Sequence, residues 1–309
     1  MAIRFAIKVV VFCLLLGGLI FGLIVRHNPY LYTQERYDAQ MRRLMQKGPT
    51  YILLGDSQSM SLEGDPLWPR SIFNASFGSD GVNEMYIKLG VALRHNPDLK
   101  GVFVNAGDHI FAQDRQGVNN WLFIKPYADR ALYKEIFHAE PQDRLFCFLT
   151  RRFPMLNPNI YVFSRQRLVE KIMGLWSTRR DSVDNSVPWG DEKNKFKRLE
   201  LAARRAHDTL SDAIIVDEFV ANYRKLLELG HKHHVRVIGV RYPVSLEYTQ
   251  EKRKYAIDKV QALFRQMPFD QFLDYTHLIE SPSYYFNPDH LNEEGGAILV
   301  KQLKTDMKL

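Results

Sequence analysis

The chain has 309 residues, of which 46% are hydrophobic and 12% aromatic, a composition typical of a folded chain with a buried core. Its net charge of +7 is compatible with an anionic membrane surface, an acidic polymer or nucleic acid. No zinc-finger spacing, RNA-binding signature or basic heptad is present, so no nucleic-acid partner is expected. The two cysteines, Cys13 and Cys147, exclude a disulfide framework and a cysteine-based structural zinc site.

An uncharged apolar run extends from Val9 to Val25, between Lys8 and Arg26. A membrane-spanning helix needs roughly 17–25 apolar residues, and flanking basic side chains reach the two interfaces. A cleaved signal peptide would instead end in a small-residue cleavage site, which the following RHNPY does not offer. We therefore predict an uncleaved anchor over residues 1–28. Arg4 and Lys8 favour a cytoplasmic amino terminus, but the other flank carries more basic residues, and these are Arg26, Arg36, Arg42 and Arg43. The charge rule therefore argues weakly against an external catalytic domain.

After the anchor, short apolar strands alternate with helices. Residues 29–48 predict a polar juxtamembrane helix, and residues 49–309 a single domain. Within it the predicted strands are 51–54, 72–75, 101–105, 235–240 and 271–274, and the predicted helices are 82–93, 214–229 (closed by Gly230) and 293–304. This alternation predicts a parallel sheet covered on both faces. In such folds the active site lies outside the carboxyl ends of the strands.

Residues from about 110 to 212 fit this alternation poorly. They are rich in aromatic side chains and carry a charged stretch from Lys193 to Arg205. We interpret them as an inserted, mainly helical cap over the strand ends. An ordinary helical layer without a substrate role is the alternative, and the pattern does not decide between the two.

The sequence LLGDSQS, residues 53–59, carries the strongest local signal of chemistry. A strand ends, Gly55 permits a tight turn, and Ser57 stands at the predicted start of a helix. That placement exposes the hydroxyl and directs backbone N–H groups toward a developing oxyanion. A serine nucleophile needs a histidine to take its proton. The candidate base is His290 in FNPDHLN, residues 286–292, just before the last helix.

With these two segments the chain resembles the SGNH/GDSL hydrolase superfamily, over about residues 50–108 and 230–303. The resemblance implies a flavodoxin-like three-layer α/β/α sandwich, with Ser57 as nucleophile and His290 as base. The sequence NASFG, residues 74–78, is similar to the second block of the family, whose glycine N–H contributes to the oxyanion hole. Gly78 matches that glycine, with Gly81 as the second choice.

Two blocks depart from the family pattern. The third usually reads Gly-x-Asn-Asp, and when NAGDH is aligned on Gly107 the asparagine slot holds His109. The third oxyanion donor is then either His109 or Asn105 from a shifted position. The fifth block usually reads Asp-x-x-His, but here Asn287 holds the acid slot of His290.

The identity of the triad acid is therefore open at this point. Asp289 supplies a carboxylate next to the histidine and is favoured slightly over Asn287, whose neutral amide could also accept a hydrogen bond from the ring. A serine–histidine dyad helped by a backbone carbonyl is the third possibility.

Anchored members of the family, such as DltD-like and polysaccharide O-acetylation proteins, have a similar plan. The resemblance implies one span in the cytoplasmic membrane, a catalytic domain on the periplasmic or extracellular side, an acylated glycan or related polymer as substrate, and a multi-span O-acyltransferase as partner. The altered blocks also allow an alternative, a catalytically impaired domain that binds glycan or acts as a scaffold in such a complex.

Metals and cofactors find no support in the sequence. His231, His233 and His234 lie together, but we interpret them as a solvated turn, because no acidic residue is adjacent to them. No Walker loop and no Gly-x-Gly-x-x-Gly motif is present.

Overall fold

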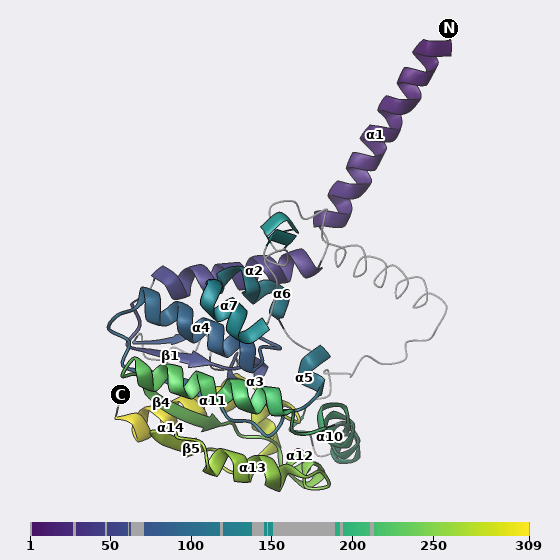
Figure 1. The fold of residues 1–309 in the computed structure, drawn as a ribbon. Helices are drawn as coiled ribbons and strands as arrows, with labels where there is room; N and C mark the ends of the chain where they lie inside the picture. The colour runs from purple at the N-terminus through teal and green to yellow at the C-terminus, as the bar shows by residue number, and fades with distance from the viewer. Residues whose placement is uncertain are drawn as a thin grey trace. The chain divides into compact units, whose positions relative to one another are not determined.

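The computed structural model describes residues 2–26, 29–46, 48–60, 62, 71–117, 120–137, 145–146, 148–150, 189–191, 194–210 and 213–308. By their internal contacts the residues divide into two units, one of residues 1–39 with 140–182 and the other of residues 40–139 with 183–309. Helix α1 (Ala2–Arg26) coincides with the predicted anchor (Figure 1). None of the helices in the described part of the chain is both long and apolar enough to cross a membrane. The anchor stays a prediction.

The second unit is built on a parallel five-stranded sheet. The strands are β1 (Tyr51–Leu54), β2 (Ile72–Asn74), β3 (Gly101–Asn105), β4 (Arg236–Arg241) and β5 (Gln271–Asp274), in the spatial order β2-β1-β3-β4-β5. Every neighbouring pair is parallel, as expected when each strand returns through a helical crossover. This order is that of flavodoxin-like doubly wound sheets. The predicted α/β class with a parallel sheet is confirmed.

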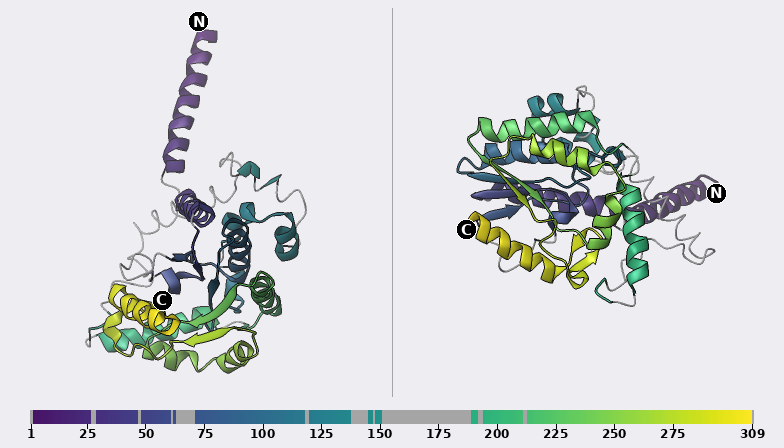
Figure 2. Two further views of the ribbon diagram at one scale, coloured as in Figure 1. Left: turned by 90° about the vertical axis from the view of Figure 1, so that its left-hand side faces the viewer. Right: turned by 90° about the horizontal axis from the view of Figure 1, so that it is seen from below.

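Helices cover both faces of the sheet. Helices α4 (Val82–His95) and α11 (Asp217–Lys232) pack on one face, and α14 (Glu293–Met307) lies on the other (Figure 2). The remaining described elements are α2 (Pro29–Gln46), α3 (Ser57–Met60), α5 (Asp114–Gly117), α6 (Trp121–Ile124), η1 (Lys125–Tyr127), α7 (Arg130–Phe137), α10 (Lys195–Leu210), α12 (Leu246–Lys252), α13 (Ile257–Arg265), η4 (Pro282–Tyr284), β6 (Tyr285–Asn287) and β7 (His290–Leu291).

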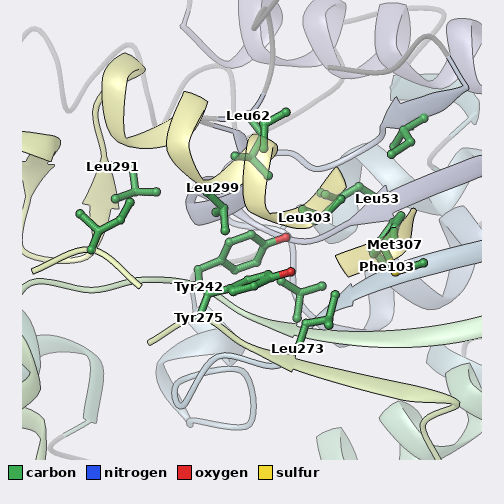
Figure 3. Close-up of a cluster of buried hydrophobic side chains, with 14 of the residues drawn as sticks. Leu53, Leu62, Phe103, Tyr242, Leu273, Tyr275, Leu291, Leu299, Leu303 and Met307 are labelled. Atoms are coloured by element: carbon green, nitrogen blue, oxygen red, sulfur yellow. The ribbon is translucent and has the colours of Figure 1, made fainter. Parts of the chain in front are cut away.

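A hydrophobic cluster joins the sheet to α14. Leu53 of β1 and Phe103 of β3 are fully buried and lie with Leu299 and Leu303 of the helix in one cluster (Figure 3). Burying one such side chain contributes about 1.5–3 kcal/mol. Because α14 follows the hairpin that carries His290, this packing also fixes where the last segment of the chain meets the sheet.

Two local predictions differ from the structure. Helix α11 begins at Asp217 and continues through Gly230 to Lys232, so Gly230 does not close it. A Cβ on Gly230 would lie 2.5 Å from Val237 Cγ2, so the glycine allows close packing of α11 on β4. No strand was predicted between residues 274 and 293, but this segment contains an antiparallel hairpin, β6–β7, with Asn287 opposite His290.

The predicted insertion is only partly within the described residues. Between residues 110 and 212 the structure describes α5, α6, η1, α7 and α10, which are all helical. The segments 138–144 and 151–188 lie outside the described residues. Whether the insertion acts as a substrate cap is untested.

Candidate active site

Ser57 lies directly after strand β1 because the chain turns sharply at Gly55. A Cβ on Gly55 would lie 2.4 Å from Ser59 Oγ and 3.2 Å from Asn105 Cβ, so only glycine permits this close approach to β3. Asp56 then accepts a hydrogen bond from the backbone N–H of Gln58 through Oδ1 at 3.0 Å. The turn places Ser57 at the first position of α3, at the carboxyl edge of the sheet as predicted.

The hairpin β6–β7 brings His290 to the same edge. Pro288 and Asp289 form its turn, and their backbone carbonyls tie the turn to two other segments. The Pro288 carbonyl accepts from the N–H of Ser245 at 2.9 Å, and the Asp289 carbonyl accepts from Gln58 Nε2 at 3.3 Å. Gln58 is therefore a direct bridge between the serine turn and the histidine hairpin.

A line of hydrogen bonds joins Ser57, His290 and the hairpin turn. Ser57 Oγ lies 2.7 Å from His290 Nε2. On the other side of the ring, Nδ1 lies 2.9 Å from Asp289 Oδ1 and 2.9 Å from Asn287 Oδ1. Asn287 Oδ1 also accepts the Asp289 backbone N–H at 3.1 Å. Both residues that the sequence offered as the acid therefore contact the ring, and Asp289 alone brings a negative charge to it.

Asp289 is almost fully buried, with 2% of its surface exposed. Burial raises its pKa, but the charges of His290 and Arg205 and their hydrogen bonds outweigh burial and hold the pKa well below its ordinary range. For His290, burial lowers the pKa, but the Asp289 charge and hydrogen bond outweigh burial and raise it above the ordinary value. Both shifts favour an ionised Asp289 facing a basic imidazole.

Arg205 of α10 is the second partner of Asp289. Its Nε donates to Asp289 Oδ2 at 3.0 Å, and its Nη2 lies 2.9 Å from the same oxygen. Each carboxylate oxygen of Asp289 thus has its own partner, Oδ1 for His290 and Oδ2 for Arg205. Sequence reasoning missed Arg205, which lies 84 positions from Asp289 in the chain and had only its membership of a charged stretch to mark it.

A second buried cluster lies around Asp56, and it contains the two side chains predicted as alternative oxyanion donors. Asn105 Nδ2 donates to Asp56 Oδ1 at 3.0 Å, while Asn105 Oδ1 accepts from the N–H of Gly107 at 2.7 Å. His109 Nε2 lies 2.7 Å from Asp56 Oδ2, and Arg115 Nη2 donates to that oxygen at 2.9 Å. The structure therefore directs these atoms of Asn105 and His109 at Asp56 and not at Ser57.

Burial raises the pKa of Asp56, but the charge and hydrogen bond of His109 and the charge of Arg115 outweigh it and hold the pKa well below the ordinary range. The Asp56 carboxylate is consequently ionised, and its hydrogen bonds hold it in place directly before Ser57 in the chain. Its role in the geometry is to hold the Gly55–Ser57 turn against β3 and α5.

Gly78, the glycine expected in the oxyanion hole, borders Ser57. A Cβ built on Gly78 would lie 3.9 Å from Ser57 Cβ. The Phe77 carbonyl accepts from the N–H of Asp80 at 3.0 Å, and the Gly78 carbonyl accepts from Asn120 Nδ2 at 2.7 Å. Because the C=O and N–H of a trans peptide point in opposite directions, the next two N–H groups, of Gly78 and Ser79, point away from these partners.

The loop behind Gly78 is held by buried polar side chains. Lys88, which is fully buried, donates to the Ala75 carbonyl and to Asp80 Oδ2 at 2.6 Å. Glu84 accepts from the N–H of Gly81 at 2.9 Å. Gly81, the second choice for the oxyanion role, is thus occupied as the N-cap of α4. This leaves Gly78 as the glycine of the loop that faces the serine.

A cavity of about 410 Å³ opens at Ser57 and His290, within the size range of small-molecule sites. Most of the described side chains that line it are polar or charged; they are Ser57, Ser79, Asp114, Arg115, Leu201, Arg204, Arg205, Asp208, Thr209, Asn287, Pro288, Asp289 and His290.

The histidine cluster at the end of α11 has an acidic partner that the sequence did not indicate. His231 Nε2 lies 3.3 Å from Asp270 Oδ2, while His233 is the C-cap residue that follows the helix. Within the described residues, no group of three or more potential metal-ligating side chains is found. The contact with Asp270 corrects the expectation that no carboxylate lies near.

Comparison with known proteins adds little to this picture. No family model matches the chain, and no curated protein matches it. A solved structure from Streptococcus pneumonia, described as a "putative platelet activating factor", is similar to 93% of this chain over 99% of its own, with 12% identity and a TM-score of 0.42. A likeness at this level carries no argument about activity.

Proposed function

We propose that the chain is a serine-dependent acyl-handling enzyme, an esterase or O-acyltransferase of the SGNH/GDSL type. The observation that carries the proposal is the line from Ser57 Oγ through His290 to Asp289, with 2.7 and 2.9 Å between the bonded atoms. A hydroxyl, an imidazole and a carboxylate in this order make a nucleophile, a base and an orienting acid. The strand order of the sheet and the position of Gly78 support the same assignment.

In the proposed mechanism, His290 Nε2 takes the proton of the Ser57 hydroxyl while Oγ attacks an ester carbonyl. The Ser57 and Gly78 N–H groups stabilise the resulting tetrahedral anion. The anion collapses, the alcohol leaves with the proton from His290, and the acyl group stays on Ser57. A water or a sugar hydroxyl then attacks the acyl-serine with His290 again as base. Asp289 holds the Nδ1 proton and stabilises the imidazolium.

Covalent labelling tests the nucleophile. A fluorophosphonate probe reacts with activated serines, so the wild-type full chain should be labelled and Ser57→Ala should not. The matched control is Ser59→Ala on the same short helix, since Ser59 Oγ donates to the Asp56 carbonyl at 2.9 Å instead of contacting His290. Loss of labelling in Ser57→Ala and its retention in the control support the proposal.

Equal labelling of wild type and Ser57→Ala would reject Ser57 as the nucleophile. If wild type is not labelled and does not turn over p-nitrophenyl acetate, the result supports the alternative function. In that alternative the domain binds glycan or acts as a scaffold without catalysis.

We further propose that the enzyme is anchored in the cytoplasmic membrane, with the catalytic domain on the periplasmic or extracellular side, and that it acts on a cell-surface glycan or related polymer. The uncharged run from Val9 to Val25 supports the anchor. The hydrogen-bonding side chains at the cavity, among them Asp208 and Thr209, support a hydroxyl-rich substrate. Fractionation of cells that express the full chain tests the first point. Recovery in the soluble fraction would contradict it.

Acyl transfer and hydrolysis differ in the fate of the acyl group. An acetyl ester incubated with the full chain and an oligosaccharide should yield acetylated sugar if transfer dominates, and acetate alone if hydrolysis dominates. A multi-span O-acyltransferase is the partner that we expect for transfer, and co-purification from membranes tests this association.

A further inference from the structure

Arg205 belongs to the site although it comes from the predicted insertion and not from the core of the fold. Two of its guanidinium nitrogens meet the same oxygen of Asp289, at 3.0 and 2.9 Å. Asp289 is buried, while the arginine side chain keeps 38% of its surface exposed and lines the cavity at Ser57. One side chain therefore links the solvent-facing cavity to the buried acid.

Helix α10 holds Arg205 in place from one side. Ala202 and Ala206, four residues apart and hence on one helix face, pack with Val244 and Tyr248 in a small buried cluster. The small alanine side chains let the helix approach closely, and Arg205 points from the adjacent face.

Polar contacts fix both ends of the same helix. Near its start, Arg198 Nε donates to Glu247 Oε1 at 2.8 Å. At its end, Thr209 Oγ1 lies 3.2 Å from the Tyr248 hydroxyl. All these contacts join α10 to α12 or to the segment before α12. They hold α10 in place independently of Arg205, so the contact between Arg205 and Asp289 is preorganised.

The charges around His290 come from several elements. Asp289 on its own hairpin and Asp56 before α3 favour the imidazolium, and Arg205 opposes it. Further charged groups line the cavity on α5 and α10, and these are Asp114, Arg115, Arg204 and Asp208. Among the described residues that line the cavity, Arg205 is the cation bonded directly to the carboxylate that His290 uses.

We propose that Arg205 is a positioning residue that orients the Asp289 carboxylate toward His290 and sets the pH range in which the imidazole acts as a base. This inference rests on the proposed serine mechanism and deepens it. By occupying Oδ2, the guanidinium leaves Oδ1 to the ring. By offsetting part of the carboxylate charge, it keeps the imidazole neutral at lower pH than Asp289 alone would allow. Helix α10 of the insertion is thereby part of the catalytic apparatus.

The test compares Arg205→Gln with wild type in the full chain. The rate of fluorophosphonate labelling is measured against pH, and the titration of His290 is followed by NMR of its ring. For Arg205→Gln we expect a roughly tenfold lower rate and an acid limb moved up by about one pH unit, together with the same upward shift in the NMR titration. An unmoved limb and an unmoved titration overturn the proposal.

Two further variants keep the result interpretable. Lys195→Gln is the matched control, because Lys195 is an exposed cation on the same helix and does not line the cavity, and it should leave the acid limb and the titration unchanged. Arg205→Lys keeps the charge but not the paired donors, so its limb should stay near that of wild type while its rate falls about threefold. If Arg205→Lys is labelled as fast as wild type, the orienting role is rejected. This outcome decides the question even if Arg205→Gln does not fold.

The two proposals fail in different ways. If wild type is never labelled, the serine mechanism fails, and the NMR titration still decides whether Arg205 controls His290. If wild type is labelled and Arg205→Gln matches it at every pH, the serine mechanism stands and the role of Arg205 is rejected.

Discussion

Two carboxylates beside Ser57 are each bound by one histidine and one arginine, yet the two sets differ in position. The outer cluster consists of Asp289, His290 and Arg205, and the inner cluster consists of Asp56, His109 and Arg115. In the outer cluster the histidine bridges a carboxylate and a serine hydroxyl. In the inner cluster Nε2 of the histidine contacts the carboxylate, and the side chains of all three residues are less than 10% exposed.

The difference shows that residue types alone do not make a catalytic site. Both clusters lower the pKa of their carboxylate against the opposing effect of burial. In the outer cluster, however, the second ring nitrogen reaches the Ser57 hydroxyl at the cavity, which is the contact that the proposed mechanism uses. In the inner cluster the same kinds of hydrogen bond and ion pair hold a tight turn against the sheet. Substitutions in the two clusters should therefore separate activity from stability.

The largest expected effect is that of His290→Ala. Without the base, turnover of p-nitrophenyl acetate should fall at least about 10³-fold, while the thermal unfolding temperature stays close to that of wild type because the ring is partly exposed. In the inner cluster, His109→Ala should do the reverse, with activity within about tenfold and a lower unfolding temperature. Comparable activity losses in the two variants would contradict the distinction.

The acids provide the next largest contrast. Asp289→Asn keeps the shape but removes the charge that stabilises the imidazolium. We expect about a 10²-fold loss of turnover, smaller than the roughly 10⁴-fold loss that follows when the ring takes the wrong tautomer, because Asn287 Oδ1 still accepts from Nδ1. Asp56→Asn leaves His109 and Arg115 buried without their counter-charge, which should destabilise the fold by about 3 kcal/mol. Urea unfolding and initial rates on both variants measure the two effects. A stable Asp56→Asn variant would show that the inner cluster is not structural.

The pH dependence should report the outer cluster. His290 must be neutral to accept the Ser57 proton, and its pKa is raised above the ordinary value, with Asp289 as the main raising influence against burial. The rate of turnover should therefore reach its maximum above that pKa and should fall about tenfold per pH unit below it. Rates measured from mildly acidic to mildly alkaline pH show the limb. A limb below the ordinary histidine pKa would mean that burial outweighs the carboxylate.

The smallest effect is expected for Asn287→Ala. Its Oδ1 shares the Nδ1 proton of His290 with Asp289, so its removal leaves the charged acceptor in place. We expect a loss of about 1 kcal/mol of transition-state stabilisation, about fivefold in turnover. If Asn287→Ala loses more activity than Asp289→Asn, the neutral amide is the orienting group and Asp289 serves the fold.

The strands and most helices followed from local patterns. The apolar run Tyr51–Leu54 was predicted with the bounds that the structure has, since a buried strand leaves an uninterrupted apolar signal. The strand Gln271–Asp274 was also predicted with the observed bounds, although only its two central residues are apolar. The hairpin around Asp289 was missed, because its strands are two or three residues long and carry no periodicity. The prediction that Gly230 ends the helix was wrong, because the sequence alone does not distinguish a glycine needed for close packing from a glycine that ends a helix.

From its own residues the sequence determined the α/β class, the edge of the sheet where chemistry is expected, and the candidacy of Ser57 and His290. These follow from rules of local periodicity and of strand ends, which act over a few neighbours. Only the tertiary structure decided that Asp289 and Asn287 both contact the ring, that Asn105 and His109 face Asp56, and that Arg205 joins the site. Each of these depends on the direction of a side chain across segments distant in the chain, which local sequence does not encode.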